Sequence, residues 1–133
     1  MLKLKGILVS IFAIAASVTI AIESAFSLSL GGTLYPEQEE EYNVQGIIMT
    51  LRFQADGNLV VYNKQSFYGG NGGNTALWSS GTEGRQIEYV TYRQGEIQFI
   101  NKGRIVNRIP IGQGSQVCLI SSGDKIGTPV GCQ

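Results

Sequence analysis

Apolar side chains follow a two-residue period through much of the chain after residue 30. Between Ile47 and Val61 they alternate, or nearly alternate, with polar ones, and many are β-branched or aromatic, which is typical of half-buried β-strands. Turn-forming residues leave about five to eight residues for each strand between them. These turn signals are Gly31-Gly32, Asp56-Gly57, the glycine-rich run 69–73, Gly81, Gly95, Gly103, 112–114 and 122–124. Because no helical periodicity follows residue 30, the pattern predicts an all-β fold of the sandwich, barrel or prism type.

The composition agrees with a weakly charged β protein and excludes several kinds of site. The 133 residues include 18 glycines, and 10 Lys and Arg residues balance 10 Asp and Glu residues, which does not suit a nucleic-acid-binding surface. The sequence contains no histidine, so Ser-His-Asp catalysis, Cys-His catalysis and histidine-ligated zinc are excluded. Two cysteines are too few for a structural zinc site. We therefore expect one domain with no cofactor, no metal and no nucleic-acid partner.

The N-terminal segment has a different character. Lys3 and Lys5 precede an uncharged, mostly apolar run from Gly6 to Ile22, which is the pattern of a secretory signal peptide. We predict a signal peptide over residues 1–21, with cleavage after residue 25 as the second option. An uncleaved membrane anchor is the alternative, because the run approaches the roughly 20 residues that span a bilayer.

Export would place the mature protein in a secreted, periplasmic or extracellular location, without membrane contact once the signal is removed. Removal of residues 1–21 leaves eight basic against ten acidic residues. In an oxidising compartment Cys118 and Cys132, 14 residues apart, are expected to form one disulfide. Redox catalysis is not expected, because the chain has no CxxC pair.

An internal repeat relates two parts of the chain. Residues 51–63 can be laid over residues 89–101 at an offset of 38, and a fainter third copy runs from Val117 to Val130. The matching pairs are Gly57 with Gly95, Leu59 with Ile97, Val61 with Phe99 and Asn63 with Asn101. The polar positions differ, since Gln54 meets Tyr92. The repeat predicts a scaffold built from similar units, with the polar chemistry present once.

One segment of this scaffold combines the groups of a binding site. Five residues alternate along it, namely Gln54, Asp56, Asn58, Val60 and Tyr62. In one extended strand they would project from a single face, opposite a buried face formed by Phe53, Leu59 and Val61. Amide, carboxylate and phenol groups around an apolar spot suit a sugar, whose hydroxyls need both donors and acceptors. The alternative is the solvent face of an amphipathic strand that ends in an Asp-Gly turn, and the residues alone do not decide.

The same residues resemble the signature of bulb-type (monocot-like) mannose-binding lectins. The run Gln54-Ala-Asp56-Gly-Asn58-Leu-Val60-Val-Tyr62 fits all five specified positions of QxDxNxVxY, and Ala76-Leu-Trp78-Ser-Ser-Gly-Thr82 looks like the W-[AS]-[ST]-x-T strand of that family. The resemblance is good over roughly residues 28–82 and weak after that. It implies a β-prism II over residues 28–133, with three four-stranded antiparallel subdomains in pseudo-threefold symmetry. The motif-bearing subdomain would lie at about 45–82.

The resemblance also implies roles for the motif residues. Asp56 and Asn58 would bind the 2-hydroxyl of mannose, Gln54 the 3-hydroxyl and Tyr62 the 4-hydroxyl, while Val60 would lie against the ring carbons. Binding in that family needs no calcium. The chain departs from the family pattern in having one motif, no mid-chain disulfide and a longer connection before the tryptophan.

We therefore predict a non-enzymatic lectin that binds mannose-containing glycans through a single site, and we leave assembly into a homo-oligomer open. The alternative is an exported structural or adhesion module that uses the same scaffold for protein contacts. Glycoside hydrolysis requires two carboxylates, and Asp56 is the only acid in the motif.

The acidic run Glu37, Glu39, Glu40 and Glu41 is interpreted as a solvated loop or edge strand. The glycine-rich loop 66–75 is a candidate for contact with a second sugar.

Overall fold

The computed structural model describes residues 28–64, 74–123 and 125–133, and all regular elements within these ranges are β-strands. The prediction of an all-β fold is confirmed. In the same ranges, no helix is long and apolar enough to cross a membrane. The predicted signal peptide over residues 1–21 and residues 66–73 of the predicted contact loop lie outside the described part of the chain.

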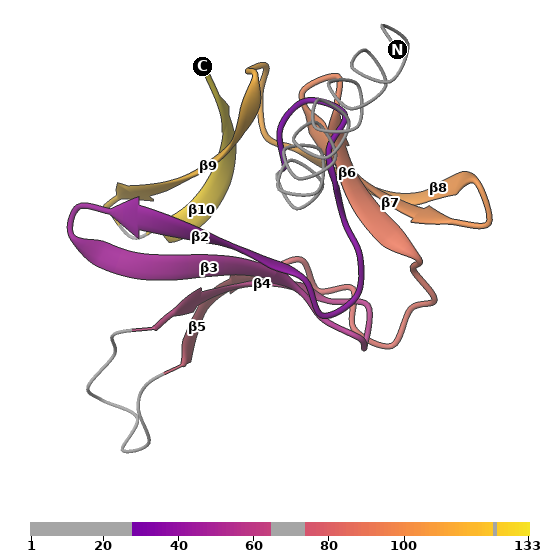
Figure 1. The fold of residues 1–133 in the computed structure, drawn as a ribbon, viewed down its shortest axis with the longest axis horizontal. Helices are drawn as coiled ribbons and strands as arrows, with labels where there is room; N and C mark the ends of the chain where they lie inside the picture. The colour runs from indigo at the N-terminus through magenta and orange to yellow at the C-terminus, as the bar shows by residue number, and fades with distance from the viewer. Residues whose placement is uncertain (1–27, 65–73, 124) are drawn as a thin grey trace, which may run out of the picture.

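The described strands form three antiparallel sheets (Figure 1). The first sheet has the order β2-β3-β4-β5, the second β1-β6-β7-β8, and the third consists of β9 and β10. Their bounds are β1 Thr33–Leu34, β2 Glu39–Val44, β3 Ile47–Phe53, β4 Leu59–Asn63, β5 Thr75–Ser79, β6 Tyr89–Arg93, β7 Glu96–Asn101, β8 Arg104–Pro110, β9 Gln116–Ser122 and β10 Lys125–Cys132. The first two sheets thus have the four strands expected of each subdomain, and the third has two.

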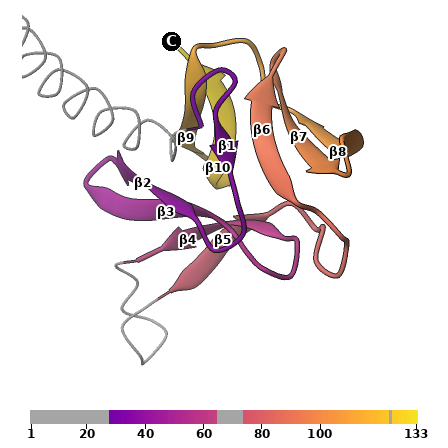
Figure 2. The same cartoon turned by 45° about the vertical axis from the view of Figure 1, so that its right-hand side comes forward.

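One hydrophobic cluster includes buried residues of all three sheets, and the sheets are arranged around a common centre in both views (Figures 1 and 2). Each sheet contributes fully buried side chains, for example Phe53 from the first, Phe99 from the second and Val117 from the third. Trp78 on β5 is partly buried and packs against this core. Because the buried residues of all three sheets belong to one cluster, the sheets are expected to unfold together.

The predicted repeat is confirmed over the second strand of each hairpin. Leu59 and Val61 on β4 and their matches Ile97 and Phe99 on β7 are all fully buried. The pairing of β4 with β5 shifts register after Val61, and the pairing of β7 with β8 shifts after the matching Phe99. The repeated irregularity shows that the two sheets share a backbone plan as well as a hydrophobic pattern.

The first strand of each hairpin does not follow the predicted offset of 38. Phe53 pairs with Leu59, whereas Tyr92 pairs with Ile97, so the buried Tyr92 corresponds to Phe53 and not to Gln54. The physical reason is loop length. Residues 55–57 separate Gln54 from Asn58, whose backbones are hydrogen-bonded, but only residues 94–95 separate the last paired residues of β6 and β7.

The third sheet is closed by the predicted disulfide. Cys118 and Cys132 are bonded, with their Cα atoms 5.8 Å apart. They lie on adjacent strands, where Cys118 is opposite Val130 and Cys132 is opposite Gln116. The bond therefore ties the C-terminal strand β10 to β9 across the hairpin.

Tyr42 on β2 connects the first sheet to the third. Its hydroxyl donates a hydrogen bond to the carbonyl oxygen of Val117 at 3.0 Å. Burial raises the pKa of the Tyr42 phenol far above its usual value, and the neighbouring Glu40 carboxylate raises it further. The phenol therefore stays protonated in the folded protein at a pH where it would ionise in the unfolded chain.

This difference predicts a loss of stability at alkaline pH. Above about pH 10 the unfolded chain releases the Tyr42 proton while the folded protein keeps it, so the free energy of unfolding falls by up to about 1.4 kcal/mol per pH unit. Tyr42→Phe is expected to reduce the slope between pH 10 and 11.5 in urea-unfolding titrations. If the free energy of unfolding falls with the same slope in the variant and the wild type, Tyr42 is not the group that causes the loss of stability.

Candidate functional site

The motif lies on a hairpin and not on one continuous strand. β3 ends at Phe53 and β4 begins at Leu59, so the prediction of five side chains along one strand face is wrong. The Asp-Gly turn signal is confirmed, because Gly57 has a φ of +90°, a left-handed conformation that glycine adopts most easily. The turn gathers the polar groups at one end of the first sheet.

Backbone hydrogen bonds define this turn. The N–H of Gln54 donates to the carbonyl of Asn58 at 2.9 Å, and the N–H of Gly57 donates to the carbonyl of Gln54 at 3.0 Å. A three-residue loop that ends in a left-handed glycine is a common hairpin connection. The carboxylate of Asp56 accepts the N–H of Asn58 at 2.9 Å, which holds the acid over the turn.

Asn58 is held in place by the end of β5 and the residues after it. Its Oδ1 atom accepts hydrogen bonds from Ser80 Oγ at 2.9 Å and from the N–H of Thr82 at 3.3 Å. Thr82 is buried, and its hydroxyl donates to the carbonyl of Gly57 at 2.7 Å. These bonds use the amide oxygen of Asn58, and its NH₂ group has no partner in the described part of the chain.

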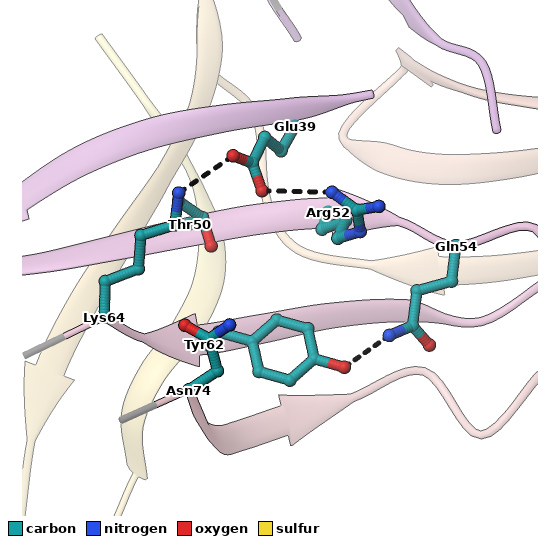
Figure 3. A pocket seen from close by; sticks show the side chains of 7 residues that line it. All are labelled: Glu39, Thr50, Arg52, Gln54, Tyr62, Lys64 and Asn74. Carbon is teal, nitrogen blue, oxygen red and sulfur yellow. Dashed lines mark hydrogen bonds and ion pairs between the residues drawn. The ribbon is translucent and has the colours of Figure 1, made fainter. Parts of the chain in front are cut away.

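Gln54 and Tyr62 approach one another from opposite sides of the hairpin. The Gln54 Nε2 group donates a hydrogen bond to the Tyr62 hydroxyl, and the tyrosine ring points back along the sheet toward the turn (Figure 3). Both side chains line a pocket of about 480 Å³ together with Glu39, Thr50, Arg52, Lys64 and Asn74. A second pocket of about 320 Å³ shares Arg52 and Gln54 and extends to Asp56.

Val60 lies on the same face of the sheet as the pocket residues, because it is paired with Arg52 in the register of β3 and β4. Only 3% of Val60 is exposed. Val60 lies between the Asp56 turn and Tyr62 along the chain, and little of its apolar surface is accessible. Val60 and Tyr62 thus lie on the pocket face of β4, whereas Gln54, Asp56 and Asn58 lie in the connection between β3 and β4.

Four charged residues beside the motif form an ion-pair network that the sequence did not lead us to expect. Glu39 accepts a hydrogen bond from Lys64 Nζ at 2.9 Å and one from Arg52 Nη1 at 3.4 Å (Figure 3). Arg52 also pairs with Glu37. The hydrogen bond from Lys64 is the main cause that lowers the pKa of Glu39. These side chains remain about one-third exposed or more, so each pair contributes at most about 1 kcal/mol.

The acidic run that supplies Glu39 does form an edge strand, β2, as predicted. The sequence also contained a signal for two further pocket residues. Thr50 and Arg52 continue the two-residue period of Gln54 toward the N-terminus, and residues at this spacing share a face in β3.

Comparisons of the chain with models of known protein families, with curated proteins and with solved structures find no match. The chemistry of this site therefore has to be inferred from its own groups. Among the described residues, no cluster of three or more His, Cys, Asp or Glu side chains could hold a metal ion. The pocket instead presents amide, phenol, hydroxyl and carboxylate groups together with two cations, a set suited to a neutral ligand with many hydroxyls.

Proposed function

We propose that this protein is a lectin that binds mannose-type glycans through Gln54, Asp56, Asn58 and Tyr62, with Val60 beneath the sugar ring. One observation carries the proposal. The hairpin brings the Gln54–Tyr62 pair to the same end of the sheet as Asp56 and Asn58, which are anchored to the turn. In the lectin family that the motif resembles, these residue types bind three neighbouring hydroxyls of mannose.

The hydrogen-bonding capacity of the site supports this assignment. The carboxylate of Asp56 is an acceptor, the NH₂ group of Asn58 is a donor, and Gln54 and Tyr62 can each donate and accept. Adjacent hydroxyls of a hexose require such a mixture. The anchoring bonds to Ser80 and Thr82 fix the Asn58 side chain before the sugar arrives, which reduces the entropy cost of binding.

We further propose that the three sheets represent a β-prism II with a reduced third subdomain, and that the protein is exported after removal of residues 1–21. The two four-stranded sheets with matching register shifts support the prism. The disulfide between Cys118 and Cys132 supports export, because such bonds persist in oxidising compartments.

Asp56→Ala is expected to weaken mannose binding at least tenfold, since a hydrogen bond to a charged group contributes roughly 1.5–3 kcal/mol. The measurement is titration calorimetry with methyl α-mannoside at high protein concentration, because a single monosaccharide site is expected to bind only in the millimolar range. Glu96→Ala, which removes an equal charge from the second sheet, should bind like the wild type. Unchanged affinity in Asp56→Ala would rule out this site.

A mannan column tests the broader function. The wild-type protein should be retained and should elute with free mannose, whereas Asp56→Ala should pass through. If the folded wild-type protein is not retained at all, the scaffold is better explained as a module for protein contacts.

A further inference from the structure

Thr50 has a buried hydroxyl group without a partner in the part of the chain that the structure describes. The residue is 1% exposed, and its Oγ1 atom has no hydrogen-bond partner within residues 28–64, 74–123 and 125–133. Buried polar groups are nearly always paired, because removal from water without a partner is unfavourable. Thr50 also lines the 480 Å³ pocket that Gln54 and Tyr62 line, so this unpaired group lies beside the proposed mannose site and outside its set of binding residues.

The register of the first sheet places Thr50 directly beside the motif. Thr50 on β3 is the cross-strand partner of Tyr62 on β4, and such partners have neighbouring side chains on the same face. The Tyr62 ring points from there back toward Gln54 and the turn (Figure 3). Thr50 therefore lies beyond the Tyr62 hydroxyl as seen from Asp56.

The Glu39–Lys64 ion pair crosses the sheet over Thr50. Glu39 is opposite Arg52 on one side of β3, and Lys64 is bonded through its backbone to Ile48 on the other side. Residues 48, 50 and 52 follow one another on this face of β3. The Glu39–Lys64 ion pair joins a residue beside Arg52 to a residue beside Ile48, and it therefore passes over Thr50, which lies between them. The bridge is partly exposed and can open at little cost.

The orientation of the sugar determines which part of a glycan can reach Thr50. In the orientation that the lectin resemblance implies, with the 2-hydroxyl at Asp56 and Asn58 and the 4-hydroxyl at Tyr62, the mannose ring would run along the sheet from the turn toward Thr50. C6 is bonded to C5, the ring carbon next to C4, and therefore extends past Tyr62. The anomeric carbon, C1, is bonded to C2 and therefore stays at the Asp56 end.

We propose that Thr50, together with Glu39 and Lys64, forms a second subsite for a sugar residue attached to O6 of the bound mannose. The Glu39–Lys64 bridge opens when this residue enters, and the Thr50 hydroxyl gains a hydrogen bond to one of its hydroxyl groups. This inference rests on the proposed function and extends it, because the protein would then recognise 6-branched mannose as well as terminal mannose.

The charges around the subsite favour a neutral sugar over an anionic substituent. Arg52 and Lys64 are already paired with Glu37 and Glu39. Glu41 adds a further carboxylate on this face, because it is the partner of Thr50 in the register of β2 and β3. A phosphate or carboxylate on C6 would meet this acidic edge, whereas a neutral ring can use both the carboxylates and the cations as hydrogen-bond partners.

The test compares three methyl mannosides by titration calorimetry: methyl α-mannoside, its 6-O-mannosyl derivative and its 2-O-mannosyl derivative. The wild type should bind the 6-linked compound roughly 3- to 10-fold more tightly than the monosaccharide, as expected for one or two added hydrogen bonds. The 2-linked compound should stay within about twofold of the monosaccharide. Thr50→Val should bind methyl α-mannoside normally and lose the preference for the 6-linked compound.

Thermal unfolding separates this role from a structural one. Thr50→Val removes an unpaired buried hydroxyl, so its melting temperature should equal or exceed that of the wild type. Thr91→Val is the matched control, since Thr91 is also buried but donates to the carbonyl of Gly32 at 2.7 Å. Its melting temperature should fall by about 3–6 °C.

Three results would overturn the proposal. Equal binding of the monosaccharide and the 6-linked compound by the wild type would reject the subsite and leave the mannose site intact. Failure of the wild type to bind any of the three compounds would reject both. A fall in the melting temperature of Thr50→Val as large as that of Thr91→Val would show that the hydroxyl already has a structural partner.

Discussion

Replacement of Gly57 by alanine is expected to lower the free energy of unfolding by roughly 3 kcal/mol or more, since backbone strain and overpacking each cost about 1–3 kcal/mol. Gly57 has a φ of +90°, and an added Cβ atom would lie 2.4 Å from the carbonyl oxygen of Arg85. Because that oxygen belongs to the backbone, the turn itself would have to move. The same turn positions Asp56 and Asn58, so mannose binding should also be lost.

Gly46 provides a matched control for this prediction. It has a similar φ of +83°, but nothing within 4 Å would meet an added Cβ atom. Gly46→Ala should therefore show the cost of the backbone conformation alone, about 1–2 kcal/mol. Urea unfolding of both variants measures the difference. Equal losses would show that the contact with Arg85 is unimportant.

Removal of the disulfide should cost about 3 kcal/mol, the value expected for closure of a loop of this length. The change is the double variant Cys118→Ser/Cys132→Ser, compared with the wild type by urea unfolding under oxidising conditions. The bond joins only β9 and β10, whereas the site lies on β3 and β4. Where the variant remains folded, its affinity for mannose should equal that of the wild type.

A reducing agent supplies the internal control for this experiment. Reduction should destabilise the wild type by a similar amount and leave the double variant unchanged. Mass spectrometry of the unreduced wild type should detect no free thiol at Cys118 or Cys132. Free thiols, or equal stability of the oxidised and reduced wild type, would contradict the structural role of the bond.

The sequence predicted the fold class because a two-residue period, together with turn glycines, depends on local backbone physics. The buried side chains of Leu59, Val61, Ile97 and Phe99 confirm that pattern. It could not give the strand count of the third sheet. There, Leu28 and Ser29 pair with the start of β9 without forming a named strand, and such long-range pairing leaves no mark in a local pattern.

The same limit explains the error at the site. Alternation along Gln54, Asp56 and Asn58 is compatible with one strand or with a tight hairpin, and only the conformation of Gly57 decides between them. The length of the second hairpin connection also explains why the polar motif residues occur only in the first hairpin. The second hairpin turns through residues 94–95, one residue fewer than the first, so it has no position equivalent to Asp56 beside a paired Asn58.

The place of β1 has a consequence for how the chain reaches its native state. β1 belongs to the second sheet, where Leu34 pairs with Val90, 56 residues later, although β2 begins the first sheet only a few residues after it. Contacts this distant in sequence slow folding, typically to milliseconds or seconds in β proteins. Cleavage of the backbone between the first and second sheets would therefore not release two folding units. The C-terminal fragment would lack its edge strand, and we expect it to fold only when the N-terminal fragment is present to supply it.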